Sequence, residues 1–229
     1  MRPVDKGVAP NAYAHYREAA DDLKLRIGDY CSYCERQIET NLAVEHIQPK
    51  SLNAGLQTTW SNFLLGCVNC NSSKGDAPIV LADYFWPDTD NTLRAVEYTA
   101  GGLVRPHPGR SAPEQARAQT TIELTGLDKD PGNPNEDRRP TSSDIRWRRR
   151  LEAWDIAVRY RDKLAAEDTI TVREAIVDIA LGRGMFSIWW NVFGGDLDMR
   201  RRLRQAFLGT HARCFNAAED AIQHPNGNI

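Results

Sequence analysis

Two Cys-x-x-Cys pairs constrain this chain more than any other feature of its sequence. Cys31 and Cys34 form the first pair, and Cys67 and Cys70 form the second. Four thiolates at about 2.3 Å from a tetrahedral Zn²⁺ ion would tie the two segments together, so that residues 35–66 would form a closed unit. Such a site leaves no position for water, and we therefore expect the zinc to be structural. The alternatives are a redox pair or unrelated cysteines, and two pairs in so short a window favour zinc.

The overall composition is that of an ordinary globular protein and sets few limits on function. The 229 residues have an apolar fraction of 41%, a charged fraction of 26% and a net charge of −2. This charge argues against a general polyanion-coating role, although local basic patches can still bind nucleic acid. No run reaches the roughly 18 apolar residues of a membrane span. The N-terminus has no signal-peptide core, and the odd cysteine count argues against a disulfide framework, so we expect a cytoplasmic protein.

The segment between the cysteine pairs contains a carboxylate beside an imidazole. Glu45 and His46 follow an apolar, strand-like run at 42–44. Hydrolysis of a phosphodiester needs a base that works near neutral pH and a cation that stabilises the leaving oxygen. His46 would supply the base, and Glu45 would supply a ligand for a hard metal ion. A histidine on its own is more often structural, so the zinc-clamped context is what gives this pair its functional meaning.

Three further polar residues surround the second cysteine pair. We expect Asn62 to hold the loop that carries His46 through hydrogen bonds to the backbone. Asn71 would begin a helix directly after Cys70, where its amide oxygen suits a hard divalent cation. Lys74 lies three residues further on the same helical face, where its ammonium would meet a phosphate. Taken singly, each residue is more typical of a capping or surface position, so their order along the chain carries the argument.

Taken in order, these motifs resemble the zinc-containing, four-cysteine branch of the HNH endonucleases, the ββα-metal superfamily. The matching pattern is Cys-x2-Cys, Glu-His-Ile-x-Pro, Trp-x-Asn-x-Leu-Leu and Cys-x2-Cys-Asn-x2-Lys, and it covers residues 31–74. The resemblance implies a strand pair and a helix that hold one Mg²⁺ or Mn²⁺ ion for cleavage of nucleic acid, most typically DNA. It assigns the general base to His46, the metal-ligand positions to Glu45 and Asn71, and the loop-orienting asparagine to Asn62.

Two positions depart from the common pattern of this family. The acidic position is more often Asp, and Glu45 is one methylene longer. The final position of the family name is filled by Asn71 in place of His. Both variants occur in the superfamily, so they affect the ligand set more than the expected activity.

The flanking sequences resemble, more loosely, the HNH nuclease components of Septu and retron-type anti-phage defence systems. The shared features are the N-terminal helix, Glu-His-x-x-Pro-Lys-Ser at 45–51 and Ala-x-x-Thr-Ile-x-Leu-x-Gly-Leu at 118–127. This resemblance implies a defence role together with an ATPase partner that controls cleavage. Two alternatives of other classes stay open: an inactive zinc-stabilised module that only binds nucleic acid, and an adaptor subunit whose helical half docks a partner.

The predicted fold class is α+β, with a small zinc-stabilised ββα-metal core, an N-terminal helix and a mainly helical C-terminal region. We expect a nuclease domain at 1–105, with a helix at 11–26 and a hairpin formed by 93–98 and 103–105. A helical domain for partner or nucleic-acid contact would follow at 106–229. Its first expected helix begins at a capping box, residues 111–114, runs to 124 and stops at Gly126. Further helices are expected at 144–165, at 175–181 after a second capping box at 171–174, and at 197–222. The tail at 225–228 is expected to be frayed.

Two arginine runs in the helical region are candidate nucleic-acid contacts outside the motifs. The first lies at 146–150 and the second at 200–204. Arginine runs are usually solvated helix faces, but a nuclease must also hold its substrate through phosphate contacts. The residues that we expect to contact nucleic acid most directly are Lys50, Lys74, Arg148 and Arg149.

The remaining histidines and the fifth cysteine suggest no second site. His107, His211 and His224 have no partners at ligand spacing, so we expect them to be structural or exposed. Cys214 is expected to be a small buried apolar residue. The apolar run 186–193 is expected to be core, with part of it open to docking a partner.

Overall fold

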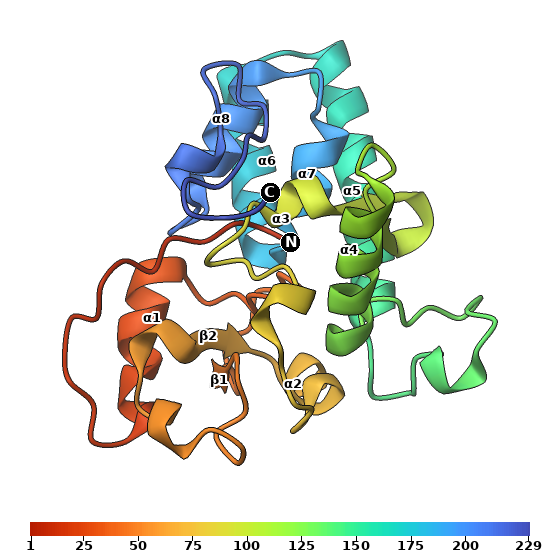
Figure 1. The fold of residues 1–229 in the computed structure, drawn as a ribbon. Helices are drawn as coiled ribbons and strands as arrows, with labels where there is room; N and C mark the ends of the chain where they lie inside the picture. Colours follow the sequence, from red (N-terminus) through yellow and green to blue (C-terminus); the bar gives the residue numbers. More distant parts are fainter.

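Helices surround two small antiparallel sheets, each of two strands (Figure 1). A computed structural model describes all of residues 1–229. The predicted α+β class is confirmed, with a cysteine-containing ββα unit followed by a mainly helical region. The strands are β1 (Ala43–His46), β2 (Phe63–Gly66), β3 (Val96–Thr99) and β4 (Leu103–Pro106); the helices are α1 (Ala19–Ile27), α2 (Val68–Lys74), α3 (Thr92–Ala95), α4 (Ala112–Thr125), α5 (Arg146–Ala166), α6 (Ile170–Arg183), α7 (Phe186–Val192) and α8 (Leu197–Ala206).

The ββα unit lies in the lower part of Figure 1 and consists of β1, β2 and α2. The two strands pair in antiparallel register, with Glu45 opposite Leu64 and His46 opposite Phe63. All four residues of β2 are buried, so this short strand is held by packing on both faces rather than by its length. Helix α1 packs against both strands. The predicted helix at 11–26 thus begins later, because a separate 3-10 turn, η1 (Tyr16–Glu18), precedes α1.

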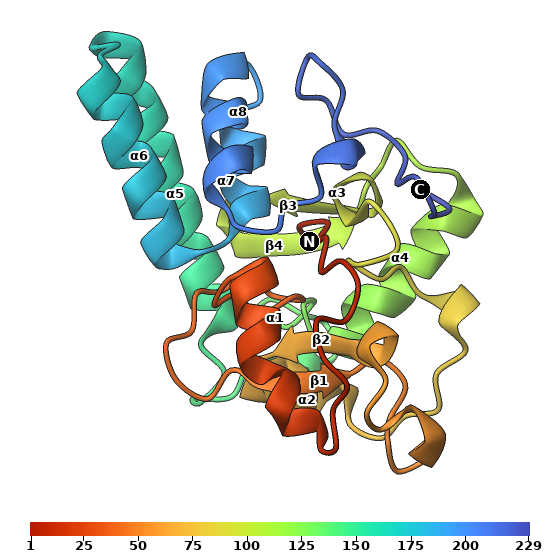
Figure 2. The same cartoon turned by 90° about the vertical axis from the view of Figure 1, so that its left-hand side faces the viewer.

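The second sheet is the predicted hairpin, and it lies between α4 and the C-terminal helices (Figure 2). Its turn contains Gly101 and Gly102, both with positive φ. A Cβ atom at Gly102 would lie 2.8 Å from the Leu151 backbone nitrogen in α5, so only glycine lets α5 pack this closely. The first residues of the predicted strand instead form the single turn α3, so the strand itself starts at Val96.

Helix α4 has the termini that its sequence predicts. The Ser111 amide donates to the Glu114 carboxylate at 2.9 Å, and the reciprocal capping box is present. Gly126 ends the helix at φ 65°, a left-handed conformation that glycine adopts without strain.

Two predictions about the C-terminal helices are wrong. The second capping box does not exist, because Thr169 caps α6 by accepting the Val172 amide at 3.3 Å. The last helix ends at Ala206 rather than at residue 222. There the Arg2 guanidinium donates to the carbonyl of Phe207 at 3.1 Å and to that of Leu208 at 2.6 Å. A distant arginine therefore takes the carbonyl groups that a longer helix would have used.

The C-terminal tail is also ordered where fraying was expected. Ile229 is buried, and its carbonyl accepts the Asn91 amide at 3.0 Å. Met1 is buried as well, and its carbonyl accepts the Thr92 hydroxyl at 2.7 Å, so both ends of the chain pack into the protein. A single cluster of 45 buried residues extends through the ββα unit and the helical region, and it includes most of the apolar run 186–193. The division into domains at residue 105 stays a prediction.

None of the helices combines the length and the apolar character that crossing a membrane requires.

Candidate active site and metal centre

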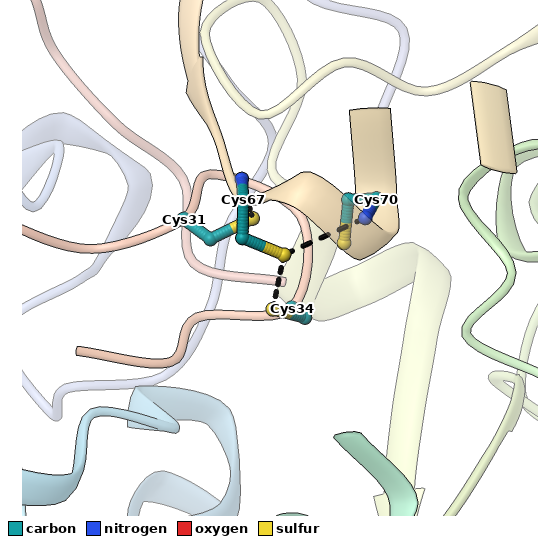
Figure 3. Close-up of side chains that lie close together, drawn as sticks. All are labelled: Cys31, Cys34, Cys67 and Cys70. Carbon is teal, nitrogen blue, oxygen red and sulfur yellow. Dashed lines mark hydrogen bonds between the residues drawn. The ribbon is translucent and has the colours of Figure 1, made fainter. Parts of the chain in front are cut away.

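The four paired cysteines form one compact cluster. Cys31 and Cys34 lie in the turn after α1, Cys67 caps α2 and Cys70 lies in its first turn. Their sulfur atoms lie within 4.8 Å of one another, and all four side chains are buried. None is in a disulfide, and the Sγ atoms of Cys34 and Cys67 are 3.7 Å apart (Figure 3). This is the arrangement that a tetrahedral zinc site requires.

Hydrogen bonds and cations around the sulfur atoms fit a bound metal ion. The Cys67 amide donates to Cys31 Sγ at 3.4 Å, and the Cys70 amide donates to Cys67 Sγ at 3.5 Å. Burial raises the pKa of the Cys31 and Cys70 thiols, so four clustered thiolates need a cation to be stable. The cluster therefore fits a structural Zn²⁺ ion.

Two arginines offset the charge that such a site would carry. Zn²⁺ with four thiolates has a net charge of −2. The Arg146 Nη1 atom donates to Cys70 Sγ at 3.2 Å. The thiolates of Cys34 and Cys67 raise the pKa of Arg36, against its desolvation by burial. A buried charge is stable only when it is paired, so the arginines complete the metal centre.

The residues of α2 that follow Cys70 border a cavity of about 400 Å³. It lies between α2, β1 and the η1 turn, and it brings together most of the residues predicted to act in catalysis. Its polar lining includes Tyr16, Arg17, Glu45, His46, Lys50, Asn71 and Lys74. Strand β1 places Glu45 and His46 at the wall, and α2 places Asn71 there because that residue directly follows Cys70. The metal cluster and the cavity thus share one helix.

His46 has one ring nitrogen held by the protein and one left for chemistry. Its Nε2 atom lies 3.0 Å from the carbonyl oxygen of Gln57. A carbonyl only accepts, so Nε2 carries the proton and Nδ1 keeps its lone pair. Burial lowers the pKa of His46, and the positive charges of Lys50 and Lys74 lower it further. The neutral, basic form of the imidazole is therefore the stable one near neutral pH.

Glu45 and Lys74 form a buried ion pair. The Lys74 Nζ atom lies 3.0 Å from Glu45 Oε1 and donates to the His46 carbonyl at 2.7 Å. Burial raises the pKa of Glu45, and the adjacent Lys74 lowers it. Lys74 thus holds β1 and its carboxylate in place, whereas the sequence analysis expected this ammonium to be free for a phosphate.

The Asn62 side chain closes the loop that follows His46. Its Oδ1 atom accepts the Gln48 amide at 2.8 Å, and its Nδ2 atom donates to the Gln48 carbonyl at 3.0 Å. These bonds mimic a backbone pair and fix the chain two residues after the imidazole. Asn71, by contrast, is exposed at the cavity and makes no hydrogen bond through its side chain, so its amide is open to a ligand.

The arginine run at 146–150 is not the basic surface that the sequence suggested. Arg146 and Arg150 are buried. Arg146 serves the metal centre, and Arg150 donates to the carbonyl groups of Gly102 at 2.8 Å and Leu127 at 3.0 Å. Only Arg148 and Arg149 face solvent, where both approach Glu152, at 3.8 Å and 2.7 Å. Their contact with nucleic acid stays a prediction.

The second run, at 200–204, is largely neutralised. All of its arginines pair with carboxylates of the same region: Arg200 with Asp220, Arg201 and Arg204 with Glu219, and Arg202 with Asp198. The local positive potential is therefore smaller than the number of arginines indicates.

Three polar residues at the cavity were missed because no motif marks them: Tyr16, Arg17 and the exposed Asp76. The Tyr16 ring lies 4.9 Å from the His46 ring, and its hydroxyl accepts the Lys50 ammonium at 3.0 Å. The hydrogen bond from Lys50 lowers the pKa of Tyr16. Arg17 lines the same cavity and is exposed. Tyr16 and Arg17 lie about one helical turn before α1, and only the packing of α1 on β1 brings them to His46.

Comparison with known proteins agrees with this geometry. Residues 31–77 match the family model described as HNH endonuclease. The chain is 28% identical over 120 residues to a relative assigned as the retron Vc95 HNH endonuclease of Vibrio cholerae serotype O1 biovar El Tor. The similarity covers 48% of this chain and 57% of the relative's length.

The family match spans both cysteine pairs, both strands of the first sheet and α2. These residues form the sulfur cluster at the start of α2 and, together with residues near the start of α1, the cavity beside Asn71 and Lys74. Residues 31–77 of this chain therefore match an HNH endonuclease domain, and their four-cysteine cluster is compatible with a zinc site.

Proposed function

We propose that this chain is a metal-dependent endonuclease that hydrolyses phosphodiester bonds, with DNA as its substrate. The observation that carries the proposal is the state of His46. Its Nε2 atom is bound to the Gln57 carbonyl at 3.0 Å, while its Nδ1 atom is free in a cavity that also contains Glu45 and Asn71. A purely structural histidine would not need this combination of a fixed tautomer, a lowered pKa and adjacent oxygen donors.

His46 is the general base in this mechanism. Neutral Nδ1 takes a proton from a water molecule as that water attacks the phosphorus, and the Gln57 carbonyl stabilises the imidazolium through the Nε2 proton. Asn62 keeps the following loop in place through both polar groups of the Gln48 backbone. The ring therefore needs no reorientation during the reaction, which lowers the cost of reaching the transition state.

Glu45 and Asn71 are the proposed ligands of a Mg²⁺ or Mn²⁺ ion. Their carboxylate and amide oxygens line one cavity, and oxygen donors of this kind suit hard divalent cations. When bound, the ion would neutralise the charge that develops on the phosphate and on the leaving oxygen. Lys74 is a positioning residue, because its ammonium orients Glu45 from the buried side.

Exposed cations at the cavity would hold the phosphate backbone. Arg17 and Lys50 lie at its wall. Such contacts fix the position of the duplex without reading its sequence. Arg148 and Arg149 on α5 are the further candidates, each with part of its charge offset by Glu152.

We also propose a role in anti-phage defence, with an ATPase partner that controls cleavage. Support comes from the relative assigned to a retron and from the flanking sequence similarity to Septu and retron-type nucleases. Five free cysteines are consistent with a reducing, cytoplasmic setting for this role.

Cleavage of supercoiled plasmid tests the nuclease proposal. Wild-type protein is incubated with Mg²⁺ or Mn²⁺, or with EDTA, beside His46→Ala and the control His107→Ala, which alters a histidine outside the cavity. We expect nicking with either metal, none with EDTA, and a loss of about 10²–10⁴-fold in the His46 variant alone. Equal nicking by wild type and His46→Ala would refute the assignment. If neither cleaves, even with the ATPase partner present, the chain is a binding or adaptor subunit.

A further inference from the structure

A second group of metal-binding side chains lies outside the HNH domain, in the segment that follows α8. His211, Cys214 and His224 each place one ligand atom within 4.8 Å of the others. Cys214 and His224 are buried, and His211 is half-buried. The sequence places no partners at ligand spacing around these histidines, but the chain after α8 folds back on itself and brings them together with Cys214.

The backbone around the three residues is held from several sides. His211 donates its amide to the Pro3 carbonyl at 3.0 Å, and the Cys214 carbonyl accepts the Ile222 amide at 2.8 Å. The Asn91 side chain donates to that same carbonyl at 2.8 Å. Separate parts of the chain therefore preorganise the cluster, which reduces the entropy that a ligand would have to remove.

Two imidazole nitrogens in the cluster have no partner. His211 Nδ1 and His224 Nε2 are buried and make no hydrogen bond, although the ring centroids are only 4.5 Å apart. Buried polar atoms are almost always paired, and an unpaired one commonly marks an absent ligand. Because His224 is 4% exposed, solvent does not supply the missing partner.

Carboxylates lie near the cluster, and two of them are already paired. Asp88 lies 2.6 Å from the Lys6 ammonium, and Asp90 lies 3.8 Å from the Arg117 guanidinium. The features that favour a metal ion are therefore the two unpaired imidazole nitrogens and the thiol between them, not the net charge around the cluster.

We propose that His211, Cys214 and His224 form a second metal site, which binds Zn²⁺ and holds together the segment of the chain that follows α8. One thiolate and two imidazoles are ligands typical of zinc, and three protein ligands leave a fourth tetrahedral position for water. Binding replaces the Cys214 S–H bond with an S–Zn bond and releases that proton to solvent.

One local rearrangement accompanies binding through His224 Nε2. In the metal-free protein, His224 Nδ1 accepts the Asn226 amide at 3.1 Å, so the ring proton lies on Nε2. The metal ion takes the Nε2 lone pair, the ring proton moves to Nδ1, and the Asn226 amide turns away. Asn226 is exposed, so water can take over this hydrogen bond at small cost.

Zinc counting by native mass spectrometry tests the site. The full-length protein is equilibrated with micromolar Zn²⁺ and desalted, alongside Cys214→Ser, His211→Asn and the control His107→Asn. We expect two zinc ions per chain in wild type and in the control, and one in each of the other two variants. His211→Asn alters the most exposed ligand, so it reports on binding if Cys214→Ser does not fold.

The same experiment can overturn the proposal. One zinc ion in wild-type protein would refute it, as would two in both cluster variants. Cobalt substitution separates the two sites, because the second one should contribute a thiolate-to-cobalt absorption band that Cys214→Ser removes. The zinc ion of the four-cysteine site should survive in every cluster variant, so the readout does not depend on nuclease activity.

Discussion

Two neighbouring parts of α2 offer a direct comparison between structural and reactive chemistry on one helix. At its start, Cys67 and Cys70 are buried among thiols, and Arg146 lies against them. Directly after Cys70, Asn71 is exposed at a cavity with His46, whose Nδ1 atom is free. The start of the helix offers only soft sulfur ligands that enclose a metal completely, and the cavity offers oxygen and nitrogen donors that leave room for water and a phosphate.

This difference shows how a domain with so little secondary structure can support catalysis. Strands of four residues and a helix of seven residues contribute few backbone hydrogen bonds. A zinc ion in the cysteine cluster would supply the rigidity that the small core lacks. The ββα unit can then stay folded although the cavity beside α2 is open and polar.

The largest effect on folding is expected at the four-cysteine cluster. A structural zinc site contributes roughly 10 kcal/mol to folding, comparable with the total stability of about 5–15 kcal/mol for a typical domain. Cys67→Ser should therefore release zinc and unfold residues 31–77, with loss of cleavage. Circular dichroism and zinc analysis would check this. Cys214→Ser is the matched control and should keep the four-cysteine zinc; a folded Cys67→Ser protein that lacks only that zinc would contradict the structural role.

A smaller loss of stability is expected at the buried ion pair between Glu45 and Lys74. Lys74→Met leaves the Glu45 carboxylate without its partner, and breaking a buried ion pair costs about 3–5 kcal/mol. Burial alone then raises the pKa of Glu45, because Lys74 no longer lowers it, so the acidic limb of the cleavage profile should move to higher pH. Denaturant unfolding and pH–rate profiles measure both effects. The double variant Glu45→Gln/Lys74→Met should regain stability but not activity, because it leaves no unpaired buried charge. If its stability is not regained, the loss in Lys74→Met comes from damage elsewhere.

The next effect concerns the basicity of His46. Its pKa lies below the ordinary value, mainly because of burial and further because of Lys50 and Lys74. The base must be neutral, so cleavage should persist below the ordinary histidine pKa and fall as His46 becomes protonated. Lys50→Met removes a positive charge, raises the pKa of His46 and should move that acidic limb upward by a fraction of a pH unit. If the acidic limb of the kcat/KM pH profile stayed in place or moved to lower pH, Lys50 would not control the pKa of His46.

The smallest effect is expected on α5, away from the cavity. Arg148 and Arg149 share one acidic neighbour, Glu152, so together they retain about one net positive charge. Replacing both by Gln should reduce the slope of log affinity against log salt by no more than about two, with kcat unchanged. Fluorescence anisotropy with labelled duplex DNA would measure this slope. If the double variant kept the wild-type slope, Arg148 and Arg149 on α5 would not contact the DNA.

The sequence was most informative where the spacing of residues along the chain alone determines which side chains lie together. Cys-x-x-Cys pairs and the adjacent Glu45-His46 specify local geometry, so the sulfur cluster and the strand–helix arrangement could be predicted. The roles of Arg146 and Lys74 could not, because each depends on a partner that is remote in sequence: Cys70 and Glu45, respectively. An arginine run looks the same in sequence whether it faces solvent or enters the core.

The C-terminal region shows the same limit more clearly. Helix α8 ends at Ala206, where Arg2 takes the next carbonyl groups and Gly209 follows with φ 70°. The fold that follows brings His211 and His224 together from positions with no motif spacing. Contacts from Pro3 and Asn91, both remote in sequence, hold this segment, so a local pattern could not reveal it.

The central claim is that the metal ion of the four-cysteine cluster and the metal ion of the cavity beside it have separate roles. The most direct test measures cleavage and zinc content on the same samples, after brief EDTA treatment and after return of Mg²⁺ or Mn²⁺. The account predicts that EDTA abolishes cleavage while the buried four-cysteine zinc stays bound, and that Mg²⁺ or Mn²⁺ alone restores activity. Cleavage by zinc-loaded protein without another divalent ion, or recovery only when Zn²⁺ is added, would contradict it.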